Sequence, residues 1–313
     1  MNIFSIVFPG QGYHKKKILL DLKKKYKIVQ DTFDEASTFL GYDLWKIINI
    51  NTDKFYYTYK SQIALLVSSI SIWKLWKDII GIKPNVIAGH SFGEYSCLIC
   101  SGILKFNEVI RLVEQRGKII KKFFPYKKGL MAAIIGTNKN NVYDLCKKAS
   151  QGEILFPAIF NNKNQTIISG NKNAVKRAIF ISYKFGAKKS FLLPICYPFH
   201  SYLMKPISKK LSKILDKLNL INPKIPFVNN ISFSCEKNIN IIKKSLIYQL
   251  YKPLNWINII KYISKIGVKI ILEFGPGNIL TKINKNIVKN IECISVNNCL
   301  SFKKACKKLN KDI

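Results

Sequence analysis

Several residue types are scarce in this sequence of 313 residues, and each scarcity excludes a class of protein. Glycine (16) and proline (11) are too few for a low-complexity or disordered chain. The longest apolar stretch, residues 63–72, is interrupted by serines and followed by lysines, so it is too short and too polar to span a bilayer. The first residues show neither the basic segment nor the cleavage site of a signal peptide. We expect a globular, cytoplasmic protein that binds no membrane.

Residues that ligate metals are scarce as well. The sequence holds three histidines, and its eight cysteines include one C-x-x-C pair, Cys97 and Cys100. A structural zinc site needs a second pair of ligands at a matching spacing, and the sequence has none. The two thiols share one face of a predicted helix, where we expect them to be reduced and partly buried. We therefore expect no metal and no cofactor.

Acidic residues and arginine are rare, whereas lysine is abundant. The 52 basic residues outnumber 17 acidic ones, which leaves a formal net charge of +35, yet only Arg111, Arg116 and Arg177 are arginine. Specific recognition of phosphate and guanine favours the planar fork of arginine, and the lysines are scattered along the whole chain. We therefore expect no specific nucleic-acid partner. A basic surface would instead attract an acidic protein partner.

Hydrophobic residues make up 48% of the chain, which is enough for a sizeable core, and their spacing predicts alternating strands and helices. This alternation is typical of a parallel sheet covered by helices. The predicted strands of this part are residues 3–8, 85–89, 226–228 and 268–274. The predicted helices are residues 29–48 with a break at Gly41, then 61–80, 94–100, 107–123, 203–218, 242–251 and 256–266.

The middle of the chain has a different order, β-α-β-β-α-β, which is typical of a ferredoxin-like unit. Its predicted strands are residues 130–135, 154–160, 166–169 and 188–193, and its predicted helices are residues 140–149 and 173–185. We therefore predict an α/β fold in which residues 1–126 and 196–313 form one discontinuous catalytic domain. Residues 127–195 form a smaller domain inserted into it.

Gly89-His90-Ser91-Phe92-Gly93 is a G-x-S-x-G motif between a predicted strand and a predicted helix. That context is the one a nucleophile elbow requires, because the turn is too tight for side chains two residues either side of the serine. The turn would lift the Ser91 hydroxyl clear of the sheet at the N-terminus of a helix. Ser91 is therefore the predicted nucleophile.

A serine hydroxyl needs a base to be nucleophilic near neutral pH, and the chain offers His14, His90 and His200. His90 precedes the serine in the elbow, so its side chain should point away and support the turn. His14 lies before three lysines and is interpreted as surface. His200 is the predicted base. A backbone carbonyl could orient its imidazole, and Glu273 at a strand end is the alternative.

Two further features complete the predicted site. The oxyanion hole should include the amide of Phe92 and an amide from the glycine loop, for which we choose Gln11, although that loop could also be a simple turn. Arg116 lies in a helix otherwise rich in lysine. It could grip a carboxylate through its planar fork, or it could form a surface salt bridge with Glu114.

Taken in order, these motifs resemble the malonyl-CoA:acyl-carrier-protein transacylases of fatty-acid synthesis and the related acyltransferase domains of polyketide synthases. The resemblance runs nearly from end to end. The shared motifs include Phe8-Pro9-Gly10-Gln11-Gly12, Gly89-His90-Ser91-Phe92-Gly93-Glu94-Tyr95, Arg116-Gly117, Val228-Asn229-Asn230, Gln249-Leu250 and Glu273-Phe274-Gly275-Pro276-Gly277.

The resemblance implies an α/β-hydrolase-like domain with a ferredoxin-like insert. It also implies that Ser91 carries the acyl group, that His200 is the base and that Arg116 pairs with the malonyl carboxylate. The backbone carbonyl of Gln249 would orient the histidine, and Gln62 would lie near the acyl pocket. The expected partners are malonyl-CoA, as a substrate, and an acidic acyl carrier protein bound transiently by a monomer.

This sequence departs from the family pattern at a few positions. Tyr13, His14 and three lysines follow the glycine loop, where the family has a small residue and Gln or Glu. Ile63 replaces the usual proline, and Ile159 stands where the family often has a second asparagine. Phe199 resembles the malonyl-selective polyketide domains, whose methylmalonyl-selective relatives have serine.

Three alternatives remain at this point. An α/β hydrolase would account for Ser91 and His200, but not for Arg116 or the insert. A basic binding protein without enzymatic activity would bind nucleic acid in a salt-sensitive way. A transacylase with a different acyl group is the nearest alternative.

Overall fold

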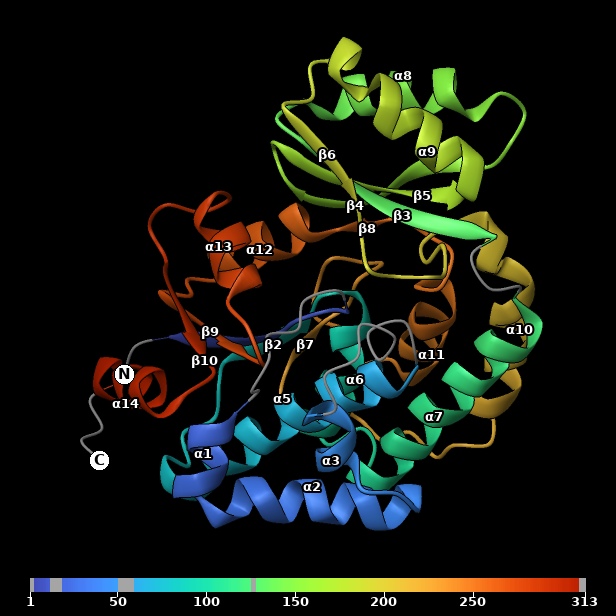
Figure 1. Ribbon diagram of the computed structural model, residues 1–313. Helices are drawn as coiled ribbons and strands as arrows, with labels where there is room; N and C mark the ends of the chain where they lie inside the picture. The colour runs from blue at the N-terminus through green and yellow to red at the C-terminus, as the bar shows by residue number, and fades with distance from the viewer. Residues whose placement is uncertain (1–2, 12–18, 50–58, 125–127, 310–313) are drawn as a thin grey trace.

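The computed structural model describes residues 3–11, 19–49, 59–124 and 128–309, and it contains two five-stranded sheets (Figure 1). The larger sheet is parallel throughout, in the order β10-β9-β1-β2-β7. Its strands are β1 (Phe4–Phe8), β2 (Val86–Gly89), β7 (Phe227–Val228), β9 (Ile270–Phe274) and β10 (Glu292–Val296). The predicted parallel sheet is therefore confirmed.

Helices cover both faces of this sheet. In Figure 1, α5 and α6 lie below it, whereas α12 and α13 lie above it. The helices of this part are α1 (Leu20–Lys25), α2 (Lys27–Leu40), α3 (Leu44–Asn49), α5 (Tyr59–Ile79), α6 (Glu94–Cys100), α7 (Phe106–Phe123), α10 (Lys205–Leu215), α11 (Ile239–Tyr248), α12 (Trp256–Lys265), α13 (Ile279–Lys285) and α14 (Cys299–Lys308). None of the described helices is long and apolar enough to cross a membrane.

The second sheet has the order β6-β3-β5-β4, extended by β8. Its elements follow one another along the chain as β3 (Gly129–Ile135), α8 (Lys139–Ser150), β4 (Leu155–Asn162), β5 (Gln165–Asn171), α9 (Lys172–Ile181) and β6 (Lys189–Leu192). This antiparallel arrangement with two helices is the predicted ferredoxin-like unit. The short strand β8 (Leu254–Asn255), which lies outside the unit in sequence, pairs in parallel with β4.

The strand β3 of the second sheet is buried on both faces, as the alternation of its side chains shows. Leu130, Ala132 and Ile134 pack against α8 and α9 in a small separate core. Met131 and Ala133, on the opposite face, join the main hydrophobic core. Successive side chains of a strand point to opposite faces, so one strand serves both cores. The ferredoxin-like unit thereby becomes a wall of the cavity described below.

Most predicted elements have their expected type, with shifted ends. The predicted break at Gly41 is confirmed, since this glycine has φ +72° and ends α2. The predicted helix 173–185 ends as an α-helix at Ile181 and continues as a 3-10 turn, Ser182–Phe185. The predicted helix 203–218 divides likewise into the 3-10 turn Tyr202–Met204 and α10. The sequence analysis missed α1, α13, α14, β8 and β10.

Candidate active site

The G-x-S-x-G motif forms the predicted elbow between β2 and the 3-10 turn Ser91–Gly93 that leads into α6. Ser91 has φ +51°, a left-handed conformation that a serine adopts only under local constraint. A Cβ atom on Gly89 would lie 2.1 Å from the Glu94 nitrogen, and one on Gly93 would lie 2.2 Å from the Phe8 carbonyl oxygen. Both glycines are therefore sterically required, as the sequence predicted.

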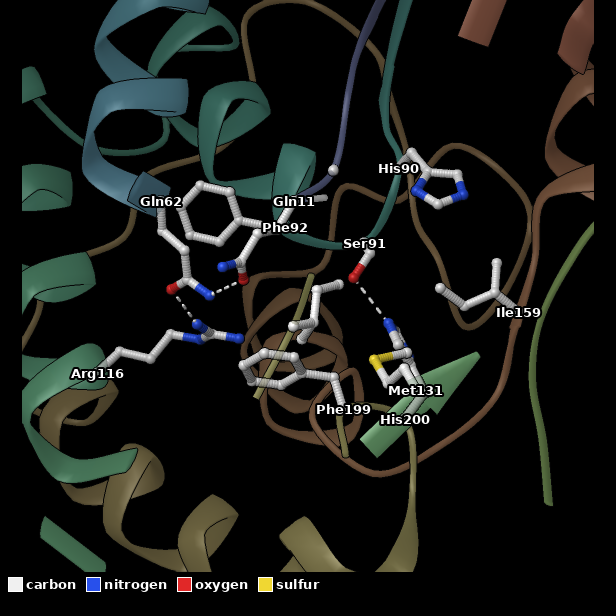
Figure 2. A pocket seen from close by; sticks show the side chains of 12 residues that line it. Gln11, Gln62, His90, Ser91, Phe92, Arg116, Met131, Ile159, Phe199 and His200 are labelled. Atoms are coloured by element: carbon white, nitrogen blue, oxygen red, sulfur yellow. Dashed lines mark hydrogen bonds between the residues drawn. The ribbon is translucent and has the colours of Figure 1, made fainter. Parts of the chain in front are cut away.

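Ser91 and His200 meet in the structure although 109 residues separate them. The Ser91 Oγ lies 2.7 Å from His200 Nε2, and the contact is visible in Figure 2. On the other side of the ring, His200 Nδ1 lies 2.9 Å from the carbonyl oxygen of Lys252. Because a carbonyl can only accept, Nδ1 carries the proton and Nε2 is left to accept the serine proton. This geometry is that of a Ser–His dyad.

The orienting carbonyl is not the one that the resemblance implied. Gln249 was expected to hold His200, but the acceptor is Lys252. Gln249 has φ −52° and ψ −31°, so it continues α11 and its carbonyl follows the helix axis. Its side chain instead donates a 2.8 Å hydrogen bond to the Ser91 carbonyl oxygen and a second one to Glu94. Gln249 therefore contacts the elbow rather than the imidazole.

Glu273, the alternative orienting group, has a different place in the structure. Its carboxylate is buried and accepts hydrogen bonds from the Leu280 amide (3.1 Å), the Thr281 amide (2.7 Å) and the Thr281 hydroxyl (2.7 Å). These donors belong to the first turn of α13, whose free amides need acceptors. Glu273 therefore caps a helix and does not orient His200.

Burial sets the protonation of both site histidines. Burial, with smaller contributions from the neighbouring His90 and Arg116, lowers the pKa of His200 to about 4 against the raising effect of the Lys252 carbonyl. Burial likewise lowers the pKa of His90 to about 4. Both rings are thus neutral near neutral pH, the state that a general base requires.

His90 points away from the nucleophile, as predicted. Its Nε2 lies 2.8 Å from the side-chain oxygen of Asn161 in β4, and its ring packs edge-on against Trp256 at 5.1 Å. Figure 2 shows the ring turned away from the contact between Ser91 and the base. His90 therefore ties the elbow to the wall formed by the ferredoxin-like unit. His14, the third histidine, lies outside the described residues.

Two buried side chains that the sequence analysis assigned no role hold the elbow from behind. Asn230 accepts from the Ser91 amide (3.1 Å) and donates to the Gly89 carbonyl (2.7 Å). Glu94, in the first turn of α6, accepts from the Asn230 amide (2.8 Å) and from Gln249. Burial raises the pKa of Glu94 to about 8. The signal for Asn230 lay in the Val228-Asn229-Asn230 motif directly after a strand.

Arg116 lies in α7 and is 4% exposed. Its Nη1 donates a 2.7 Å hydrogen bond to the side-chain oxygen of Gln62. Its guanidinium carbon lies 5.6 Å from the ring centre of Phe92 and 5.1 Å from that of Phe199. No carboxylate among the described residues reaches it within ion-pair distance.

The alternative reading of Arg116, a surface salt bridge with Glu114, is therefore wrong. Glu114 pairs instead with Lys118 at 2.9 Å, one turn further along α7 on its exposed side. Glu114 and Lys118 are four residues apart and share one face of the helix. Arg116 is only two residues from each of them, so its side chain points in a different direction, into the protein. The arginine is a buried cation that still needs an anionic partner.

One cavity brings the predicted site residues together. Arg116, Gln62 and Gln11 line one part, and the dyad lies across from them, as Figure 2 shows. The sequence reasoning assigned no role to Met131 or Ile195, and it singled out Ile159 as a departure from the family pattern that could alter contacts with the pantetheine; all three line the cavity. The residues lining the cavity are Gly10, Gln11, Gln62, His90, Ser91, Phe92, Arg116, Met131, Ile159, Ile195, Phe199 and His200. Gln249 is the one predicted site residue that is not part of this lining.

In the described part of the chain, no group of three or more His, Cys, Asp or Glu side chains is placed to hold a metal ion. The eight cysteines are free thiols, and Cys97 and Cys100 are both buried in α6.

A strained serine on an elbow, a neutral imidazole within hydrogen-bonding distance of it and an inserted ferredoxin-like wall together define a serine enzyme of acyl transfer. Comparison with known proteins agrees. The family model described as acyl transferase domain matches residues 5–300. The chain therefore belongs to the acyl transferase family, and its relatives narrow that family further.

Three similar proteins within this family are compared with the chain in sequence or structure. The malonyl CoA-acyl carrier protein transacylase of Escherichia coli (strain K12) is 39% identical over 298 residues, which cover 95% of this chain and 96% of the relative. The crystal structure of an acyl carrier protein S-malonyltransferase from Vibrio cholerae has a TM-score of 0.91 at 41% identity, covering 97% and 99% of the two chains. A malonyl-transacylase solved in complex with its type II polyketide synthase acyl-carrier protein has a TM-score of 0.94 at 38% identity, with the same coverage.

Proposed function

We propose that the protein transfers the malonyl group from malonyl-CoA to the phosphopantetheine thiol of an acyl carrier protein, through a malonyl ester on Ser91. One observation carries this proposal most directly. The buried Arg116 has no acidic partner among the described residues and lines the same cavity as the Ser91–His200 pair. An acyl group that ends in a carboxylate would supply the missing anion.

The chemistry proceeds in two matched halves. Ser91 Oγ attacks the thioester carbonyl while His200 Nε2 takes the hydroxyl proton. The amides of Gln11 and Phe92 hold the negative oxygen of the tetrahedral intermediate. The intermediate expels coenzyme A, whose sulfur receives the proton from the imidazolium. The thiol of the carrier protein then attacks the serine ester by the same steps in reverse order.

The imidazolium that forms in each half is stabilised by the Lys252 carbonyl, which accepts from Nδ1. The chain needs no resident cofactor for these steps, because the coenzyme A thioester is itself a substrate. We further propose that residues 1–126 and 196–313 carry the catalytic groups, with residues 127–195 as an inserted domain. The separate small core within the insert supports this division.

The partner in the second half-reaction is proposed to be an acidic carrier protein. A relative of this chain has been solved in complex with an acyl-carrier protein, and the net charge of +35 suits an acidic surface.

The test is covalent labelling. Brief mixing with malonyl-CoA, followed by intact-mass spectrometry, should add one malonyl group to the wild type and none to Ser91→Ala. Ser232→Ala, which changes an exposed serine, is the control and should label fully. A malonyl adduct on Ser91→Ala would overturn the assignment. Addition of holo carrier protein should discharge the adduct as malonyl carrier protein, whereas a hydrolase would release malonate at the same rate without it.

A further inference from the structure

Four polar side chains form a continuous hydrogen-bonded chain along one side of the cavity. Arg116 Nη1 donates to Gln62 Oε1 at 2.7 Å. Gln62 Nε2 donates to Gln11 Oε1 at 2.6 Å, and Gln11 Nε2 donates to Ser61 Oγ at 3.2 Å. Figure 2 shows the two links between Arg116 and Gln11. The chain joins the buried cation to the loop that follows β1.

The charge of Arg116 fixes the direction of every bond in this chain. A guanidinium can only donate, so the side-chain oxygen of Gln62 must face it. The NH₂ group of Gln62 must then face Gln11 and meet its oxygen. The NH₂ group of Gln11 is left to donate to Ser61. Neither amide can be flipped without placing two donors or two acceptors together, and such a mismatch is costly in a buried site.

Most of this chain of hydrogen bonds is also sheltered from water. Arg116, Gln62 and Ser61 are 4%, 3% and 0% exposed. Gln11, the third of the four residues, is half-buried and directly follows Gly10 in the loop that also contains Pro9. A hydrogen bond in such surroundings is stronger than the same bond in water, because the local dielectric is low. The four side chains therefore form one linked unit between the buried cation and the Gln11 side chain.

We propose that Gln62 and the side chain of Gln11 are positioning residues that couple carboxylate binding at Arg116 to the placement of the Gln11 amide. The inference rests on the proposed function, in which that amide stabilises the oxyanion. Gln11 thereby has two separable parts: its backbone serves every acyl group, and its side chain links it to the carboxylate site.

The coupling favours malonyl over acetyl in the chemical step as well as in binding. A malonyl carboxylate that engages Arg116 draws the guanidinium, Gln62 and Gln11 into one arrangement while the thioester reacts. An acetyl group makes no such contact, so the Gln11 amide keeps its resting position. The benefit to malonyl therefore falls mainly on kcat, because it is realised where charge develops on the carbonyl oxygen.

The experiment compares kcat/KM for malonyl-CoA and acetyl-CoA in Gln11→Met and Gln62→Met, each alone and combined with Arg116→Ala. Methionine keeps the length of glutamine but removes both hydrogen bonds. Each single variant should lower the malonyl-to-acetyl ratio about tenfold, a coupling of about 1.4 kcal/mol, chiefly through kcat. In the Arg116→Ala background the same changes should leave the ratio as it is. The control is Gln115→Met, an exposed neighbour on α7, which should leave the wild-type ratio unchanged.

Equal losses for both thioesters would overturn the coupling, since a merely structural role lowers both alike. So would effects that simply add to that of Arg116→Ala. Should Gln11→Met fail to fold, a normal ratio in folded Gln62→Met overturns the proposal by itself. Failure of the proposed function would be recognised separately, because the wild type would then form no malonyl ester on Ser91.

Discussion

At the scale of single residues, the most informative feature is a cation buried without an anion. Transferring an unpaired charge into a protein interior costs several kcal/mol, and proteins usually offset that cost with a carboxylate. Among the described residues, Arg116 contacts the Gln62 side-chain oxygen and the side chains of Phe92, Tyr95 and Phe199, and no carboxylate lies within ion-pair distance. Arg116 and Ser91 line the same cavity, which supports the proposal that the anion arrives with the substrate.

Arg116→Ala should therefore raise the activation free energy for malonyl-CoA, measured from kcat/KM, by several kcal/mol. The kcat/KM for acetyl-CoA should stay unchanged or improve, because an acetyl group has no carboxylate that the arginine could bind. Arg116→Lys should restore activity only in part, since a point charge cannot replace the planar fork. Specificity constants for both thioesters provide the measurement. Arg111→Ala, an exposed arginine on the same helix, is the matched control. An unchanged malonyl-to-acetyl ratio in Arg116→Ala would remove this arginine from the acyl site.

The second prediction at this scale concerns pH. Burial lowers the pKa of His200 to about 4 from the ordinary 6.5, with help from His90 and Arg116. The neutral base is thus present above about pH 4 and is lost as the pH falls through that value. Burst acylation of Ser91 by p-nitrophenyl acetate, an uncharged donor, should show its acid limb near pH 4. Tryptophan fluorescence monitors folding during the brief pH jump. An acid limb near pH 6.5 would show that the imidazole is solvated.

At the scale of elements, the helices, strands and turns that depend on a local sequence pattern could be predicted. The helix α7 repeats its apolar residues at helical spacing, and the elbow needs glycines at two set positions, so neighbouring residues sufficed. The strand order within the ferredoxin-like unit followed from its element order. The strand β8 was missed because two residues carry no periodicity, and it exists only because β4 offers it an edge.

The side chains of the candidate site could be predicted from the sequence, whereas the backbone carbonyl that contacts His200 could not. The structure places Ser91, His200 and Arg116 in one cavity. The sequence pointed to them through the G-x-S-x-G motif, through elimination among three histidines and through the rarity of arginine. The Lys252 carbonyl could not be found in this way, because every residue has a carbonyl and only tertiary structure decides which one faces the imidazole. Glu273 was considered for the dyad because carboxylates are the usual orienting groups, yet the free amides of α13 had the stronger demand for it.

At the scale of the whole molecule, the dominant feature is unbalanced positive charge. The 52 lysine and arginine residues outnumber the 17 acidic residues so far that pairing every acidic side chain would still leave a net charge of +35. Exposed charges of one sign act over about 10 Å at an ionic strength of about 0.1 M and over about 3 Å at about 1 M. Such a field accelerates the encounter with an oppositely charged protein without adding contacts in the bound state.

The proposed acidic carrier protein should therefore be a salt-sensitive substrate. Raising the ionic strength from about 0.1 M to about 1 M should increase the KM for holo carrier protein about tenfold and leave kcat nearly constant, because screening weakens the encounter and not the chemistry. Free pantetheine, an uncharged thiol acceptor, is the control and should keep its KM over the same range. The measurement is the discharge of malonyl-Ser91 at each salt concentration. A carrier KM that does not respond to salt would show that the positive surface plays no part in recognition.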